Sequence, residues 1–364
     1  SMSRSFSSFA KIEFAPPQYL ALSTAGIDVS TSGVKVVFLK ETHKGLVLDR
    51  YAEEPLPLGA IENSEIVNQE ALAKALSTLV KKLGLARANI TLSESRGYLF
   101  EADTEGSAGT WCTQVEQHLD EYIPLPASDV VFDVVPLTEG TDRSHVIGIG
   151  YPRRVVTNAL AAFEDSGITV RAIEAETFAL PRAVLRRGDT DTVLIVDIGK
   201  TSTKLLIASA RLPRFATTLE VGGHAITLAA QKYLAATEEE ATRIKAEYGL
   251  VGGEGLSGGE EYQAVVTETI SGIRDEIVRR LDYWQSRQSL IEGYAPVSRI
   301  LLVGGNASLR GLPEFLTASL SIPVERADVF ANLAPREDWM PPMDFAQSLT
   351  YGTAIGLALR EYES

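Results

Sequence analysis

The stretch 191-DTVLIVDIGKTSTKLLIAS-209 decides the fold of this chain. An apolar run leads to Asp197, a tight turn of small and hydroxylated residues follows, and a second apolar run carries the chain away. Such runs on either side of a short glycine-containing loop predict a β-hairpin. The turn can direct backbone N–H groups and hydroxyls at an anion, and the carboxylate can hold a hydrated cation. Alone the pattern is weak, because Asp and Gly are common in turns.

A second copy of the pattern lies near the N-terminus, in 25-AGIDVSTSGVKVVFLK-40. Here Asp28 follows an apolar residue and precedes a turn of small side chains. The turn residues are Ser30, Thr31, Ser32 and Gly33. Asp28 and Asp197 are 169 positions apart (197 − 28), close to half the chain, which indicates an internal duplication and not a short repeat. The alternative is chance similarity of two Asp-containing turns.

Composition limits the class of protein. With 364 residues, 45% of them apolar and 23% charged, the chain is expected to be globular and to form two domains or lobes. The net charge of −14 argues against a surface that coats nucleic acid. A single cysteine, Cys112, excludes a disulfide framework. No apolar run approaches the ~20 residues of a membrane helix. Residues 1–24 lack the apolar core of a signal peptide and are predicted to be a flexible leader.

Between the two hairpins the sequence predicts an inserted module. A helix over 65–83, ending at Gly84, precedes it. Short strands and a helix then alternate up to Ile173. The expected elements are strands at 90–92, 97–102, 130–137 and 146–150 and a helix at 111–123. His145 lies at a strand start and is interpreted as structural, because no serine or aspartate accompanies it in a catalytic pattern.

Two further helices flank the central hairpin. A helix over 174–187 is expected to place Glu174 and Glu176 in its first turn, where carboxylates interact favourably with the helix dipole. After the hairpin, Gly222-Gly223 is expected to begin a helix of about 25 residues. Its second half, 238–249, is rich in charges and is interpreted as mostly a solvated face.

The third informative stretch is 299-RILLVGGNASLRGLPEFLTASLSIPVE-325. A buried strand is predicted to end at Gly304, Gly305 and Asn306. Because glycine has no Cβ, a flat ring or a ribose can approach the backbone closely there. A dinucleotide-binding fold is the alternative, but the G-x-G-x-x-G spacing is absent and no acidic residue stands at the expected distance.

Together the three glycine-bearing loops resemble the actin-like ATPase superfamily. The matching segments are 26-GIDVSTSGVK-35, 197-DIGKTSTK-204 and 303-VGGNASLRGL-312. Within the superfamily the chain is most similar to the PilM family of type IV pilus assembly, of which FtsA is a relative. That likeness rests on 27-IDVSTSGVKVVFL-39, 121-EYIPLPASDVVFDV-134, 173-IEAETFALPRAVL-185 and 345-FAQSLTYGTAIGLALR-360.

The resemblance implies an α/β, actin-like (ribonuclease H-like) fold. It would have two lobes, a duplicated β-sheet core and a nucleotide cleft between the lobes. Residues 25–190 plus 342–364 would form the first lobe, with an FtsA/PilM-type inserted subdomain at 88–170. Residues 191–341 would form the second lobe.

ATP and Mg²⁺ are the ligands that the resemblance implies. Asp28 and Asp197 would hold a hydrated Mg²⁺, since this ion keeps most of its waters. The residues expected to line the phosphates and the nucleoside are Ser30, Thr31, Ser32, Gly33, Gly199, Lys200, Thr201, Ser202, Gly222, Gly223, Gly304, Gly305 and Asn306. Glu174 or Glu176 would orient an attacking water, with at most slow ATP hydrolysis.

Two details of the hairpins qualify this expectation. The first hairpin departs from the superfamily pattern, which carries a glycine where this chain has Ser30. A serine can replace that glycine only if the backbone does not need a positive φ there. Lys35 and Lys204 lie beyond the turns and are expected to face solvent or to close the lobes.

The function implied is a cytoplasmic, ATP-binding scaffold of the type IV pilus, or of a related secretion or competence system. It would bind the N-terminal tail of a PilN-like inner-membrane protein and so be peripheral to that membrane. Other pilus components or a second copy are further expected partners. The alternatives are an FtsA-like membrane-tethered filament protein and a small-molecule kinase of the same superfamily.

Overall fold

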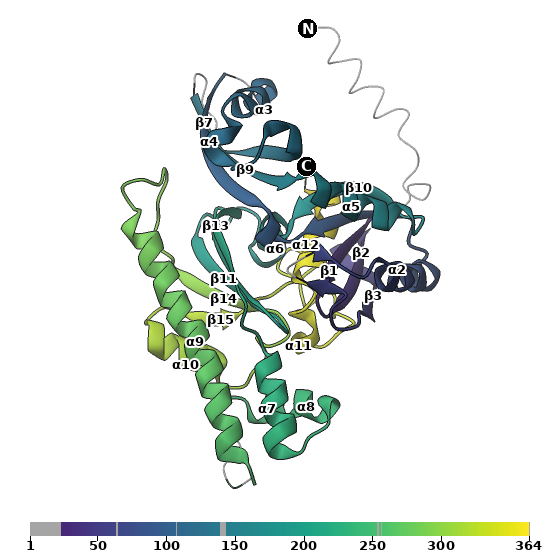
Figure 1. Ribbon diagram of the computed structural model, residues 1–364, viewed down its shortest axis with the longest axis vertical. Helices are drawn as coiled ribbons and strands as arrows, with labels where there is room; N and C mark the ends of the chain where they lie inside the picture. Colours follow the sequence, from purple (N-terminus) through teal and green to yellow (C-terminus); the bar gives the residue numbers. More distant parts are fainter. Residues whose placement is uncertain are drawn as a thin grey trace.

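Two five-stranded sheets with the same strand order form the body of this computed structural model (Figure 1). The structure describes residues 23–62, 65–106, 108–138, 143–252, 255 and 257–363. Most of the predicted leader, 1–22, therefore lies outside the described residues. Within the described part, no helix combines the length and the apolar character needed to cross a membrane.

The duplication predicted from the two Asp-containing hairpins is present in the strand order. The first sheet consists of β1 (Ala25–Ser30), β2 (Gly33–Thr42), β3 (Gly45–Pro55), β6 (Arg87–Leu92) and β10 (Thr169–Ala175). The second consists of β11 (Thr192–Ile198), β12 (Thr203–Ser209), β13 (Leu212–Leu219), β14 (Arg299–Val303) and β15 (Val324–Arg326). In each sheet three strands form an antiparallel meander, and two more add in parallel beside the first strand.

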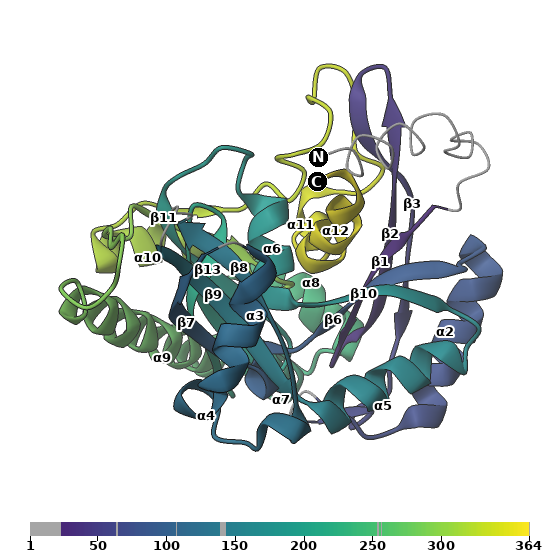
Figure 2. The same cartoon turned by 90° about the horizontal axis from the view of Figure 1, so that it is seen from above.

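Two helices pack between the sheets and join the lobes. They are α6 (Glu176–Val184) and α12 (Gly352–Leu359), whose side chains share one apolar core with both sheets (Figure 2). The contact is close enough to exclude side chains. A Cβ on Gly26 would lie 2.0 Å from the carbonyl oxygen of Ala354, and a Cβ on Gly356 would lie 1.8 Å from that of Ala179.

The outer face of the first sheet is covered by α2 (Gln69–Leu83) and α5 (Arg153–Glu164). The helix predicted from residue 65 begins at Gln69 instead. The Asn68 side chain accepts a hydrogen bond from the Ala71 amide at 2.9 Å and caps the helix there. Residues before the cap form the small hairpin of β4 (Ile61–Glu62) and β5 (Glu65–Ile66).

The inserted module has its own sheet and core. Its elements are β7 (Tyr98–Glu105), α3 (Ala108–Gln117), α4 (Leu119–Tyr122), β8 (Val130–Thr138) and β9 (Arg143–Pro152), with a 3-10 turn at Ala127–Asp129. Another 3-10 turn, Glu94–Arg96, connects β6 to the module. The predicted insertion, 88–170, is longer than this module. β6 and β10 pair within the first sheet, and α5 packs on its core, so we propose limits of about 98–152 for the insertion.

The second lobe carries most of its helices on the face away from α6. They are α7 (His224–Leu234), α8 (Glu238–Tyr248), α9 (Gly259–Ser286) and α10 (Leu312–Leu320). Two short elements, α11 (Phe345–Ser348) and a 3-10 turn at Arg360–Tyr362, flank α12. The single helix of about 25 residues predicted after Gly223 is wrong. The chain leaves the helix at Ala235, with φ 50°, and Thr237 starts α8 through a capping box with Glu240.

The glycine contact between α6 and α12 gives a stability test. Replacing Gly356 by Ala should force the two helices apart and lower the free energy of unfolding by about 1–3 kcal/mol. Gly272, in α9, is the matched control because a Cβ there meets nothing within 4 Å. Gly272→Ala should instead stabilise the protein by up to about 1 kcal/mol, as measured by chemical denaturation. Equal effects of the two changes would contradict the close contact.

Candidate functional site

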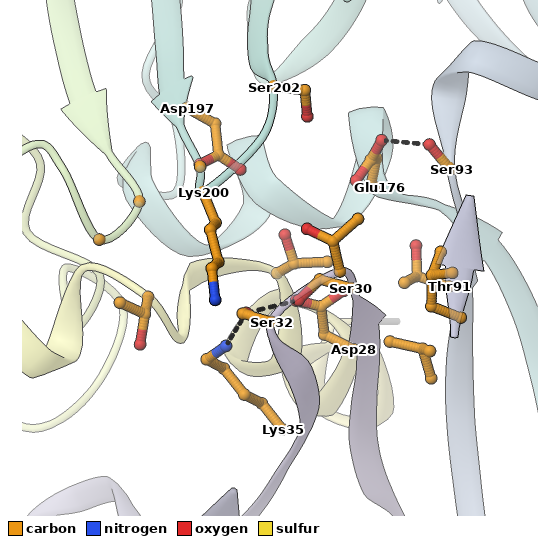
Figure 3. A pocket seen from close by; sticks show the side chains of 18 of the residues that line it. Asp28, Ser30, Ser32, Lys35, Thr91, Ser93, Glu176, Asp197, Lys200 and Ser202 are labelled. Carbon is orange, nitrogen blue, oxygen red and sulfur yellow. Dashed lines mark hydrogen bonds between the residues drawn. The ribbon is translucent and has the colours of Figure 1, made fainter. Parts of the chain in front are cut away.

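The turns of the two Asp-containing hairpins face each other across a pocket of about 370 Å³ (Figure 3). The residues predicted as a site that line it are Asp28, Ser30, Thr31, Ser32, Glu176, Asp197, Gly199, Lys200, Ser202, Gly304, Gly305 and Asn306. They come from β1, β11, the two turns, α6 and the loop after β14. Residues far apart in the sequence therefore meet at one place, as the three-loop pattern predicts.

The two hairpins present the same pair of side chains in the same register. Asp28 is opposite Lys35 in the first hairpin, and Asp197 is opposite Lys204 in the second. Directly opposed residues of an antiparallel pair point to one face of the sheet, so each aspartate has a lysine beside it. The turns also touch across the cleft, where Thr201 Oγ1 donates to Thr31 Oγ1 at 3.4 Å.

Ser30 fits its turn without a positive φ. The residues other than glycine with positive φ in the described chain are Ala210, Arg211, Ala235 and Ser321. The hydroxyl of Ser30 donates to the Gly33 carbonyl at 3.3 Å and lies 2.9 Å from that of Ser32. The serine at this position therefore causes no backbone strain.

Lys35 and Lys204 were expected to face solvent or to close the lobes; they line the pocket, so the first of these alternatives is wrong. Lys35 is 4% exposed; its Nζ lies 3.2 Å from Glu53 and donates to Ser32 Oγ at 3.3 Å. Lys204 Nζ lies 2.5 Å from Glu176 Oε2. A sequence signal was available: each lysine follows its aspartate by seven residues (35 − 28 and 204 − 197).

Carboxylates crowd the pocket and oppose each other's ionisation. Burial raises the pKa of Asp28 to about 6; Lys35 and Lys204 act against this, and the negative charges of Glu176 and Asp197 add to it. Burial likewise raises the pKa of Asp197. Burial opposes protonation of Lys204, but Glu176 and Asp197 outweigh it and raise that pKa. The two aspartates thus form a site that a cation would stabilise.

The two candidate glutamates lie in different environments. Glu174 belongs to β10 and not to the first turn of the helix, which begins at Glu176. It is buried and bound by Arg182, with Nη1 to Oε2 at 2.9 Å, and by Arg360 at 3.3 Å. This ion pair is a structural contact outside the pocket lining. Glu176 does line the pocket, and its Oε1 accepts from Ser93 Oγ at 3.3 Å.

The loop after β14 closes the other end of the pocket. Gly304 has φ 88°, and a Cβ there would lie 2.3 Å from Asp197 Oδ1. Gly305 is exposed, as a residue should be where a ring could approach the backbone. Asn306 Nδ2 donates to the Gly199 carbonyl at 2.8 Å, which links this loop to the second hairpin.

Besides Glu174, four other predicted site residues lie outside the pocket lining. Gly33, Gly222 and Gly223 allow close backbone contacts: a Cβ would lie 2.5 Å from the Glu54 carbonyl oxygen, 2.6 Å from that of Lys200 and 1.9 Å from Asn306 Oδ1, respectively. Thr201 contacts Thr31 of the other lobe. These residues support the turns and the loop and are not themselves exposed to the pocket.

Sequence reasoning missed α8 as a wall of the pocket. Thr242 and Lys245 line it, and Lys245 Nζ donates to Asn306 Oδ1 at 3.2 Å. Burial, together with the charge of Lys200, lowers the pKa of Lys245 to about 8. The charged sequence of this helix resembles a solvated face, and only the break at Ala235 turns it toward the cleft.

Comparison with known proteins decides the family. The family model of the type IV pilus assembly protein PilM matches residues 26–362. The chain belongs to the PilM family. A solved structure described as the PilM–PilN type IV pilus biogenesis complex is 21% identical, with a TM-score of 0.76, over 94% of this chain and 99% of that one.

More distant solved structures agree on the fold. MreB 5 of Spiroplasma citri bound to AMPPNP is 14% identical, with a TM-score of 0.54, over 96% of this chain and 97% of that one. The ethanolamine utilization protein EutJ from Carboxydothermus hydrogenoformans is 15% identical, with a TM-score of 0.52, over 94% and 90%. The predicted two-lobed, actin-like α/β fold and the PilM-type assignment are confirmed.

The raised pKa of Asp28 gives a pH-dependent stability. Because its folded pKa, about 6, exceeds the unfolded value of 3.8, the metal-free folded state should lose stability as pH rises from 3.8 to 6. The side chain of Asn resembles a protonated carboxyl, so the stability of Asp28→Asn should not fall over this pH range. Above pH 6 the variant should therefore be more stable than the parent by about 2–3 kcal/mol. Denaturation in EDTA across this range measures it. The control is Asp282→Asn, at an exposed position of α9, which should follow the parent.

Proposed function

We propose that the chain is an ATP-binding scaffold of the inner-membrane platform that assembles type IV pili. The observation that carries the proposal is the convergence of two Asp-containing hairpins and the Gly304-Gly305 loop on one pocket. Membership of the PilM family gives the cellular process. Distant structural relatives in this fold were solved with AMPPNP or with ADP, which supports a nucleotide as the ligand.

The residues present fit a magnesium–nucleotide complex. Asp28 and Asp197 come from opposite lobes, and the burial that raises both their pKa values would be offset by a divalent cation between them. The ammonium groups of Lys35, Lys200 and Lys204 line the same pocket and suit a polyphosphate. Bound Mg²⁺ would supply positive charge to the phosphates, while keeping most of its waters.

The phosphates would lie between the two turns. Backbone N–H groups and hydroxyls of small residues provide neutral donors there. The turn residues proposed for this role are Ser30, Thr31, Ser32, Gly199 and Ser202. The nucleoside would lie over Gly304, Gly305 and Asn306, with α8 as the far wall.

Glu176 is the residue proposed to orient an attacking water. It stands in the pocket on the first turn of α6, held by Ser93 and Lys204. The ammonium of Lys204 competes with a water for the same carboxylate oxygen, which favours slow turnover. ATP would then serve mainly to fix the angle between the lobes.

We further propose that the chain binds the N-terminal tail of a PilN-like inner-membrane protein. A solved structure with the same fold is described as a PilM–PilN complex, and the family assignment supports the same type of partner here. The inserted module would provide part of the binding groove. Attachment to the membrane would then run through the partner's tail.

Magnesium-dependent nucleotide binding tests the pocket. Asp197→Asn should weaken ATP binding about 10- to 100-fold in Mg²⁺, because it removes one charged ligand from the cation site. In EDTA the difference in ATP affinity between the variant and the parent should be smaller than in Mg²⁺ or absent. Isothermal titration calorimetry measures both, with Asp282→Asn as a control of equal charge change. Unchanged affinity of Asp197→Asn in Mg²⁺ would remove Asp197 from the site.

Binding of the partner tests the scaffold. A labelled peptide from the N-terminal tail of a PilN-like protein should bind the parent, and its affinity should differ about tenfold between ATP·Mg²⁺ and ADP·Mg²⁺. Asp197→Ala should still bind the peptide but lose the difference between nucleotides. Fluorescence anisotropy with a scrambled peptide as control measures this. Absence of binding in every nucleotide condition would contradict the proposed partner.

A further inference from the structure

The inserted module touches the second lobe through a cluster of charged side chains. Glu101 and Asp103 lie on β7, and His145 faces them from β9. The second lobe contributes Arg214, from β13, and Glu292, from the turn after α9. Figure 1 shows the module beside β13 and the adjoining end of α9. This cluster lies apart from the pocket, which none of these residues lines.

Arg214 forms the direct bridge between the two parts. Its Nε donates to Glu101 Oε1 at 2.6 Å and its Nη2 to Glu101 Oε2 at 3.1 Å. The same Nη2 donates to the carbonyl of Glu292 at 2.8 Å. The side chain of Arg214 is only 4% exposed, so this bidentate pair is shielded from water and from salt.

His145 lies between carboxylates on both of its ring nitrogens. Nε2 is 2.9 Å from Glu101 Oε2, and Nδ1 is 2.9 Å from Asp103 Oδ1 and 3.7 Å from Glu292 Oε2. A neutral imidazole has one N–H and can donate from only one ring nitrogen, to Glu101 or to Asp103. An imidazolium donates from both nitrogens and can bind both carboxylates. The geometry is therefore complete only when His145 is protonated.

The charge balance of the cluster leads to the same conclusion. The charged groups that face His145 are Glu101, Asp103, Glu292, Arg143 and Arg214. Three negative and two positive charges leave one negative charge when the histidine is neutral. A proton on His145 cancels it.

We propose that Arg214, Glu101 and His145 form a proton-dependent latch that holds the inserted module against the second lobe. Protonation of His145 closes the latch by drawing in Glu292 of the second lobe and by fixing Glu101 in position for Arg214. Loss of the proton weakens these bonds and leaves the Arg214–Glu101 pair as the main contact. The module can then move relative to the second lobe.

The direction of the pH effect follows from the surroundings of His145. Burial lowers its pKa, but the hydrogen bonds to Glu101 and Asp103 and the charges of Glu101 and Glu292 outweigh burial, so the pKa lies above 6.5. The latch is thus fully closed below that value and opens as pH rises through the raised pKa. Hydrogen bonds from His145 and Arg143 lower the pKa of Asp103, which keeps that carboxylate ionised throughout.

The chain offers a convenient distance probe for this movement. Its single cysteine, Cys112, is exposed on α3 of the module, and Gln285→Cys would add a second exposed site near the end of α9. Spin labels at the two positions report the module-to-lobe distance by double electron–electron resonance. Between about pH 6 and about pH 8.5, the ratio of latched to open populations should fall by up to about tenfold per pH unit.

Three substitutions decide the outcome. His145→Gln should abolish the pH dependence, and Arg214→Ala should populate the open distance at every pH. His118→Gln is the matched control, because His118 lies in the same module and pairs with Glu121 at 3.1 Å within it. That variant should respond to pH like the parent. A pH-independent distance in the parent, or the same response in His145→Gln, would overturn the latch.

A metal ion is the rival explanation for this cluster. Ligand atoms of Asp103, His145 and Glu292 lie within 4.8 Å of one another. Measuring the module-to-lobe distance in EDTA and in added Zn²⁺ distinguishes a proton latch from a metal site. A proton latch should be unaffected by EDTA, and a distance that responds to EDTA or Zn²⁺ in place of pH would overturn it.

Discussion

The structure depends on the placement of two aspartates at the ends of paired strands in opposite lobes. β1 and β11 deliver Asp28 and Asp197 to the same pocket, where burial opposes the charge that both would carry. Isolated buried carboxylates are costly, and the fold reduces the cost by setting a lysine opposite each one. Burial nevertheless still raises the pKa of both aspartates, so a cation placed between them would stabilise their charged forms.

The duplication gives each hairpin the same pair of an aspartate and a lysine, but the two lysines have different further partners. Both hairpins have the same register, and both lysines occupy equivalent positions. Their partners differ: Lys35 pairs with Glu53 of its own sheet, whereas Lys204 pairs with Glu176 on the helix between the sheets. The second hairpin is therefore tied to the helix that joins the lobes. A ligand that displaced Lys204 in the pocket would therefore act on α6 through this pair.

The sequence contained enough to predict the hairpin at the centre of each sheet and the three loops that meet at the pocket. Apolar strands around two Asp-containing turns have strong local signals, and Asp28, Asp197, Gly304 and Gly305 lie where the pattern places them. The errors come from tertiary effects. Glu174 was assigned to a helix because a first-turn glutamate is common, but pairing with β6 extends β10 through it. The role of Lys245 depends on a helix break that one residue with positive φ creates.

The pocket and the latch lie on the same two strands of the second sheet. Lys204 stands at the pocket end of β12, and Arg214 lies near the other end of β13, which pairs with β12 along its length. A sheet is stiff compared with the contacts at its edges. A rotation of this lobe that moves Asp197 and Lys204 would therefore also move Arg214 against the module. If ligand binding in the pocket shifts the latch, protonation of His145 must shift ligand affinity by the same factor, because coupling between two sites is reciprocal.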